Sequence, residues 1–202
     1  MNDLGFSSIE DSSKVFLVSD THFYHANAID YCNRPFNNYH EMNQCMIEKW
    51  NSIVTDRDIV FFLGDFALGQ CDKEQTYKDL SVRLHGTIVF LKGNHDRSAQ
   101  CLSDYFHVIP DRFCITCQGY NFILTHKPLP YSEIPKGYTN IHGHIHDIVL
   151  GERVRDYKNP DNIIFYGKGC HKNVSVDVTN FEPISLMSII DEIERGILKP
   201  KN

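Results

Sequence analysis

The chain lacks several features that mark particular classes of protein. No apolar run approaches the roughly 20 residues of a membrane-spanning helix, and the polar, acidic first 14 residues do not read as a secretory signal peptide. The formal net charge is −6, which argues against a large basic surface for nucleic acid. There is no internal repeat, low-complexity segment or linker within the 202 residues. We therefore expect one domain over residues 1–202, with residues 1–14 as a flexible or edge segment, and no membrane partner.

Paired cysteine motifs are also scarce. The seven cysteines are odd in number and scattered, so without a secretory signal we expect reduced thiols and a cytoplasmic location. Cys114 and Cys117 form one CxxC, and no second CxxC accompanies it. The surrounding pattern predicts a strand with one cysteine on each face, in preference to a structural zinc or redox site.

The first half of the chain alternates strand and helix patterns. Short runs of β-branched and aromatic residues predict strands over residues 14–19, 58–63 and 88–91. Apolar residues at helical spacing predict helices over residues 38–54 and 72–84, with shorter helical pieces at 27–33 and 98–105. This alternation is typical of parallel βαβ units.

The second half is rich in strands. Short strands are predicted over residues 106–109, 112–117, 120–125, 139–142, 147–150, 162–166 and 173–178, followed by a helix within 183–198. Tight connections such as Gln118-Gly119 favour antiparallel pairing there. Two sheets packed face to face, with helices outside, would satisfy both halves of this α/β chain.

Polar side chains follow five of the predicted strands at the point where each strand ends. They are Asp20 and His22, Asp65, Asn94 and His95, His126, and His144 with His146. Ligands bind beyond the carboxyl ends of strands in open α/β sheets. Side chains two residues apart in an extended chain point to the same side. Asp20 and His22 can therefore face the same way, and so can His144 and His146. Glycines at positions 64, 93 and 143 allow the backbone to turn sharply and aim these groups.

These residues supply more ligands than one metal ion needs. Three carry Asp or Asn oxygens and four carry histidine nitrogens, namely Asp20, Asp65, Asn94, His22, His126, His144 and His146. The set predicts two divalent ions that share one ligand, and a carboxylate with two oxygens makes Asp65 the natural bridge. Two ions about 3.5–4 Å apart can clamp a phosphate while a bridging hydroxide attacks it. Manganese is the first expectation, with iron, zinc or nickel as alternatives.

The five motif blocks, in this order across residues 20–146, resemble the calcineurin-like metallophosphoesterase superfamily. The resemblance implies a four-layer α/β/β/α sandwich of two mixed sheets with a dinuclear centre. It implies that Asp20, His22 and His146 hold one metal, that Asn94, His126 and His144 hold the other, and that Asp65 bridges them. His95 would protonate or stabilise the leaving oxygen, with Asp96 behind it. No long insertion builds a cap, so the chain looks like a small member with an open site.

The expected activity is hydrolysis of small phosphate mono- or diesters of nucleotide type. The alternatives are a nuclease acting on short DNA or RNA ends, and a non-catalytic phosphate-binding scaffold of the same fold. Because the loop after His22 must lie near the metals, His25 and Arg34 are candidate contacts for a substrate phosphate. His142, which precedes Gly143 in a strand, is expected to be structural.

Overall fold

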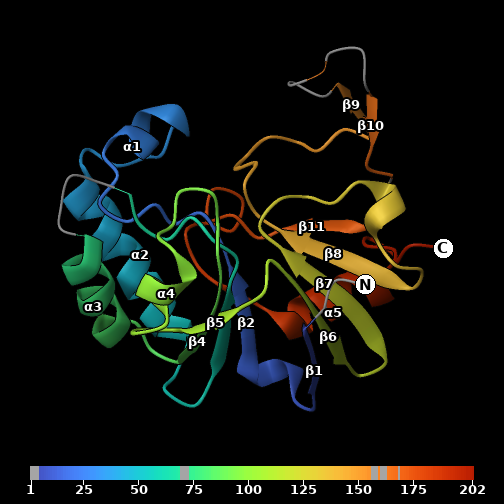
Figure 1. The fold of residues 1–202 in the computed structure, drawn as a ribbon, viewed down its shortest axis with the longest axis horizontal. Helices are drawn as coiled ribbons and strands as arrows, with labels where there is room; N and C mark the ends of the chain where they lie inside the picture. The colour runs from blue at the N-terminus through green and yellow to red at the C-terminus, as the bar shows by residue number, and fades with distance from the viewer. Residues whose placement is uncertain (1–4, 69–72, 156–158, 160–162, 168) are drawn as a thin grey trace.

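Two five-stranded sheets form the centre of the protein in the computed structural model, which describes residues 5–68, 73–155, 159, 163–167 and 169–202. One sheet has the strand order β12-β2-β3-β4-β5 and the other the order β1-β6-β7-β8-β11. They stand side by side in Figure 1, with helices α1, α2 and α3 beyond the first sheet. The predicted α/β fold of two mixed sheets with helices is confirmed.

The first sheet is built from the βαβ units of the first half. Strands β2 (Val15–Val18), β3 (Ile59–Phe62), β4 (Thr87–Leu91) and β5 (His107–Ile109) pair in parallel. The antiparallel edge strand β12 (Ile184–Ser185) pairs with β2. The carboxyl ends of β2, β3 and β4 therefore meet at one edge of the sheet.

The second sheet is mixed, so the expected antiparallel pairing is wrong for most of it. Only β6 (Arg112–Cys117) and β7 (Tyr120–Thr125) pair antiparallel among its described strands. Strand β1 (Gly5–Ile9) pairs in parallel with β6, β8 (Tyr138–His142) with β7, and β11 (His171–Asn173) with β8. Parallel strands need a long crossover, and the segment from β7 to β8, which holds the 3-10 helix η2 (Tyr131–Glu133), provides one. Residues 5–9 are therefore an edge strand.

In the parallel strands β2, β3 and β4 of the first sheet, alternate side chains are buried on opposite faces. In β2, Phe16 and Val18 pack with α2 (Tyr39–Ile53) and α3 (Lys73–Arg83) in one core. Val15 and Leu17 face the other way, into a core shared with the second sheet. Near-continuous apolar strands are expected of parallel strands buried on both faces. The short helices α1 (Asn27–Tyr31) and α4 (Ala99–Leu102) also lie on the α2 side of this sheet (Figure 1).

The second sheet has a thinner outer layer. Cys114 and Ile123, which are cross-strand partners, pack there with Leu129 and Ile134 from the η2 crossover. Cys117 faces the central core, so the two cysteines of the CxxC lie on opposite faces of β6 as predicted. The last helix, α5 (Leu186–Glu194), buries its apolar side in that same central core.

Some expected elements differ in the second half. Residues 147–150 are a turn and irregular chain, and the strand there is wrong; Ile148 and Val149 are exposed. The strands lie further on, as the hairpin of β9 (Arg153–Arg155) and β10 (Ile163–Phe165), which projects from the body in Figure 1. The strand expected at 173–178 is instead β11 with a single bridge from Ser175 to Ser19. None of the helices in the described residues is long and apolar enough to cross a membrane.

Candidate metal centre

The polar residues after five strands converge where the two sheets meet. The chain after β2 runs beside the chain after β3, since Asp20 N donates to Gly64 O at 3.0 Å and His22 N to Asp65 O at 3.1 Å. In the second sheet, Gly143 N donates to His126 O at 2.9 Å. The two halves are tied together by His144 N, which donates to Asp20 Oδ2 at 2.8 Å.

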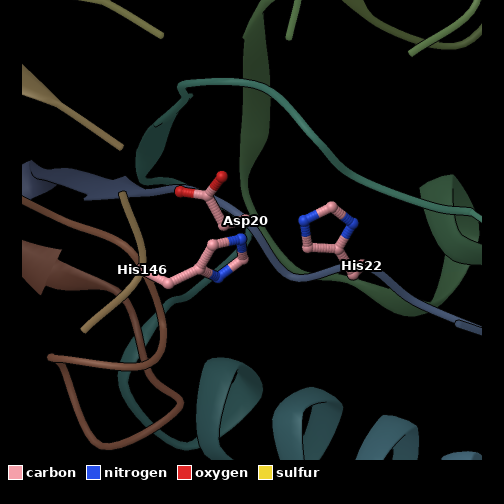
Figure 2. A group of neighbouring side chains, drawn as sticks. All are labelled: Asp20, His22 and His146. Carbon is pink, nitrogen blue, oxygen red and sulfur yellow. The ribbon is translucent and has the colours of Figure 1, made fainter. Parts of the chain in front are cut away.

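One group of candidate ligands contains Asp20, His22 and His146. One ligand atom from each lies within 4.8 Å of the others. Figure 2 shows Asp20 and His22 on the segment after β2, with the ring of His146 reaching toward them from the segment after β8. The His22 and His146 rings are stacked with centroids 5.2 Å apart.

A second group contains Asp65, His126 and His144, again with ligand atoms within 4.8 Å of one another. His126 Nε2 lies 3.0 Å from Asn94 Oδ1 and 3.2 Å from His144 Nδ1. The other nitrogen of His126, Nδ1, donates to Leu63 O at 2.8 Å, so Nε2 is the nitrogen that faces the group.

Asp65 lies between the two groups. Its Oδ2 is 3.8 Å from His22 Nε2 and 3.4 Å from His126 Nε2. Its Oδ1 accepts a hydrogen bond from His95 N at 2.9 Å, which fixes the carboxylate plane. One carboxylate oxygen thus faces a histidine nitrogen from each group.

The three glycines are required mainly by close packing. A Cβ at Gly93 would collide with the Asp65 side chain, and a Cβ at Gly143 would collide with Ser19 and Asp20. Gly64 has φ +92° and would also press on the Gly93 backbone. The sharp backbone turn expected at these glycines is therefore present at Gly64. At Gly93 and Gly143 the missing side chain instead lets neighbouring segments come close.

The buried acids differ in their proton affinity. Burial raises the pKa of Asp20, against the pull of the nearby histidines His126 and His146. Burial also favours a higher pKa at Asp65. Hydrogen bonding to His126 and the charges of His126 and His22 outweigh it and hold the pKa of Asp65 well below its usual range. Asp65 is therefore a carboxylate at neutral pH.

The surroundings shift the pKa values of the histidines in both directions. Burial lowers the pKa of His22 to about 3, and burial with the charges of His126 and Lys127 lowers that of His144 to about 4. At His126 and His146 burial is outweighed by carboxylate partners; the pKa of His126 is raised and that of His146 reaches about 10. Cations binding to these two rings would displace their protons.

The donor atoms suit divalent cations. Asp20 Oδ1 is buried without a hydrogen-bond partner among the described residues, although its partner oxygen is bonded. A buried carboxylate oxygen with no donor is costly unless a cation or another donor meets it. Mixed carboxylate, amide and imidazole donors match manganese, iron, zinc or nickel.

His95 and His25 lie beside the first group. The ring centroid of His22 is 5.7 Å from that of His95 and 5.6 Å from that of His25. His95 is exposed and His25 is half-buried. Both rings therefore border the first group of candidate ligands.

Asp96 was expected to support the His95 ring, but among the described residues its carboxylate bonds to backbone N–H groups. It accepts three hydrogen bonds, from Asp65 N at 2.7 Å, Phe66 N at 2.9 Å and Gly93 N at 2.8 Å. These bonds hold the loops after β3 and β4 together. In this structure Asp96 therefore positions Asp65.

Arg34 does not face a substrate, which corrects the second candidate contact. The exposed fraction of its side chain is 0%. Its guanidinium donates to Asp177 from Nε and Nη2, to Thr21 O from Nη1 at 2.8 Å, and to Asp20 O from Nη2 at 2.7 Å. Met42 Sδ, 3.4 Å from Nη1, completes its surroundings. Arg34 therefore braces the backbone that carries the ligands.

Sequence reasoning missed Asp177. Its buried carboxylate accepts from His146 Nδ1 at 2.6 Å and binds Arg34 at 2.8 Å, while Cys32 Sγ lies 3.4 Å from the same histidine nitrogen. Burial is outweighed by these cationic partners, so the pKa of Asp177 falls to about 2. One sequence signal was present, because Asp177 is the single charge in the apolar alternation of residues 174–178.

His142 stands apart from the cluster. It is buried, its Nδ1 lies 2.9 Å from Gly143 O, and its ring packs 5.5 Å from that of His171. Burial lowers the pKa of His142 to about 3, so it is neutral. This placement agrees with a structural role.

The two-sheet α/β sandwich gathers carboxylates and imidazoles at its strand ends, in groups that could hold metal ions. The family model of calcineurin-like phosphoesterases matches residues 13–188. The chain belongs to the calcineurin-like phosphoesterase family, whose members are metal-dependent and act on phosphate esters.

Relatives extend over most of the chain. An uncharacterised protein of Methanocaldococcus jannaschii is 42% identical over 183 residues, which are 91% of this chain and 93% of that protein. A protein of unknown function from Aquifex aeolicus has a similar structure, with a TM-score of 0.64, 24% identity, and coverage of 89% of this chain and 98% of that one. This second likeness shows a shared fold.

Proposed function

We propose that the protein is a dinuclear-metal-dependent phosphoesterase that hydrolyses mono- or diesters of nucleotide type. The observation that supports this most directly is the position of Asp65 Oδ2, 3.8 Å from His22 Nε2 and 3.4 Å from His126 Nε2. A carboxylate placed between two donor groups is suited to bridge two ions.

In this proposal the two groups of ligands each hold one cation. Asp20, His22 and His146 hold the first, Asn94, His126 and His144 the second, and Asp65 belongs to both. Bound there, divalent cations supply positive charge to the phosphate oxygens and lower the pKa of water toward neutrality. The resident metal is proposed to be manganese, with iron, zinc or nickel as alternatives.

His95 is proposed as the proton donor to the leaving oxygen. Its backbone N–H is fixed to Asp65 Oδ1 at 2.9 Å, which places the residue at the cluster, and the residue is exposed to solvent. A positioned imidazole in this role contributes about 10²–10⁴-fold to a rate. His25, 5.6 Å from the His22 ring, is proposed to contact the substrate phosphate.

The test compares two leaving groups. Chelator-treated protein is reloaded with manganese, zinc, iron or nickel and assayed on phenyl and p-nitrophenyl phosphates and on their diesters. Asp65→Asn is expected to lose at least a hundredfold in kcat/KM and to bind fewer than two ions. His95→Ala is expected to keep its metal content and to lose more activity on phenyl esters, because p-nitrophenolate needs no proton to leave.

His107→Ala is the matched control, because His107 is exposed in β5 and lies outside both groups of ligands. It should retain wild-type activity and metal content. If wild-type protein is no faster than Asp65→Asn with any of these metals and esters, the proposed activity is wrong. A His95→Ala loss that is equal for both leaving groups would remove the proton-donor role alone.

A further inference from the structure

A second pocket adjoins the candidate metal centre. It has a volume of about 300 Å³ and shares Asn94 and His126 with the second group of ligands. Lys92, Arg112 and Lys127 contribute three cationic side chains to its lining. We call it the rim pocket. Its size is at the lower end of the range for small-molecule sites, so it fits a group of a nucleotide rather than a duplex.

The chain fixes these lysines next to the ligands. Lys92 directly follows β4 and precedes Gly93-Asn94, and Lys127 directly follows His126. The turn at Lys127 is held in place, because Thr125 Oγ1 donates to Lys127 O at 2.7 Å and Leu129 N donates to the buried Asn140 Oδ1 at 2.9 Å. The backbone that carries Lys127 is therefore preorganised.

The charge of the rim pocket opposes that of the whole chain. Neither Lys92 nor Lys127 forms an ion pair with any residue that the structure describes. Arg112 pairs with Glu133, and Asp111 also lines the cavity. Three cations against these two acids leave one positive charge, in a chain whose net charge is −6. The Arg112 pair is half-exposed, so it costs little to open toward an anion.

We propose that the rim pocket binds a second phosphate of the substrate, so that the preferred substrates are nucleotide-sized esters carrying two phosphates. This rests on the proposed function, since the first phosphate occupies the metal centre. The shared residues Asn94 and His126 place the two phosphates on adjacent sites. Lys92 and Lys127 are the specificity-determining residues, because each offers an unpaired ammonium to phosphate oxygens.

The experiment uses two substrates that differ by one phosphate. Thymidine 5′-(p-nitrophenyl phosphate) is compared with the same ester phosphorylated at the 3′ oxygen, using metal-loaded full-length protein. Wild-type protein is expected to favour the 3′-phosphorylated ester by tenfold or more in kcat/KM. Lys92→Gln and Lys127→Gln should each reduce this ratio several-fold, and the double variant should bring it close to one.

Lys78→Gln is the control, because Lys78 is exposed on α3 and does not line the rim pocket. It should leave the ratio unchanged. A wild-type ratio near one, or a ratio that survives the double variant, would overturn the rim-pocket proposal. Either result would leave the phosphoesterase proposal standing, because both esters would still be hydrolysed.

If neither ester is hydrolysed, cleavage of nucleotide diesters fails, the aryl monoesters of the first test decide the remaining activity, and binding decides the rim pocket alone. Calorimetry compares thymidine 3′,5′-bisphosphate with thymidine 5′-phosphate on the same metal-loaded protein. A preference for the bisphosphate that the double variant loses supports the pocket. Equal affinities for the two ligands count against it.

Discussion

Five of the proposed metal ligands have a left-handed backbone. Their φ angles are 58° at Asp20, 48° at His22, 59° at Asp65, 71° at His144 and 49° at His146. Such angles are uncommon for residues other than glycine, although Asp and His tolerate them better than most. They persist where the surroundings dictate them and they gather at functional sites. At this cluster the strand-end hydrogen bonds supply that constraint, so the ligand side chains are oriented before a cation binds.

The residue types that bind metals could be read from the sequence, but their supports could not. Asp20 and His146 are polar groups that follow predicted strands, so their positions in the sequence mark them as candidate ligands. Asp177 and Arg34 meet only because segments 143 positions apart fold together. Asp96 was expected to support His95 because adjacency in sequence suggested contact, whereas its carboxylate turns toward backbone N–H groups.

The contact between Asp177 and His146 predicts a change in metal binding. Asp177 fixes the Nδ1 proton of His146 and so directs Nε2 toward the first group of ligands. Losing such a partner typically costs about 10–100-fold in metal affinity. Asp177→Asn should therefore lower the affinity for one of the two ions by that factor in a calorimetric titration, while the other ion binds as in the wild type.

The exposed residue Asp191 provides the control, because Asp191→Asn on α5 makes the same chemical change away from the cluster. Circular dichroism at the assay temperature shows whether each variant is folded. Two ions bound to a folded Asp177→Asn protein with wild-type affinity would contradict the role given to this carboxylate.

At the scale of elements, strands buried on both faces were the easiest to predict. The runs that became β3 and β4 are continuous and apolar, as parallel strands covered on both sides must be. The run Ile148-Val149-Leu150 is apolar too, yet it forms no strand, and no strand in the described part of the chain pairs with it. The strand propensity of a residue reflects how well its side chain fits on a pleated sheet. Whether a sheet is present at that position depends on the tertiary fold.

Helix α2 shows how one apolar stripe secures the first layer. Met42, Met46 and Trp50 recur at helical spacing and are buried against the first sheet. Trp50 is 1% exposed, and its Nε1 donates to His85 O at 2.9 Å, which ties the helix to the loop before β4. The indole thus contributes both apolar burial and a hydrogen bond.

Replacing Trp50 is expected to cost far more than replacing its neighbour at the helix end. Trp50→Ala should lower the free energy of unfolding by about 3–5 kcal/mol, as large-to-small changes of buried aromatic residues do. Ile53→Ala, at a residue that is 38% exposed, should cost less than about 1 kcal/mol. Urea unfolding followed by circular dichroism measures both, and similar losses for the two variants would show that the α2 stripe is not the anchor of this layer.

At the scale of the whole molecule, the cluster joins two sheets that otherwise share a hydrophobic core. His144 N and Asp20 Oδ2 connect them at 2.8 Å, and the Ser19–Ser175 bridge lies next to this contact. Ligands of both proposed ions come from both sheets, since Asp20 and Asp65 follow the first sheet and His146 and His126 the second. Bound cations would therefore connect the two sheets at their strand ends.

This arrangement predicts that metal binding stabilises the entire fold. A ligand that binds only the native state adds about 2.7 kcal/mol at 100 times its Kd. For a chain of this size, that corresponds to a rise of about 5–10 °C in Tm. Manganese added to chelator-treated protein should raise Tm by this amount, since the unfolded chain no longer brings the ligands together. Asp65→Asn should lose most of the increase because Asp65 serves both ions, whereas Asp191→Asn should keep it. A Tm that manganese leaves unchanged in the wild type, or raises equally in Asp65→Asn, would show that cations do not link the two sheets through this carboxylate.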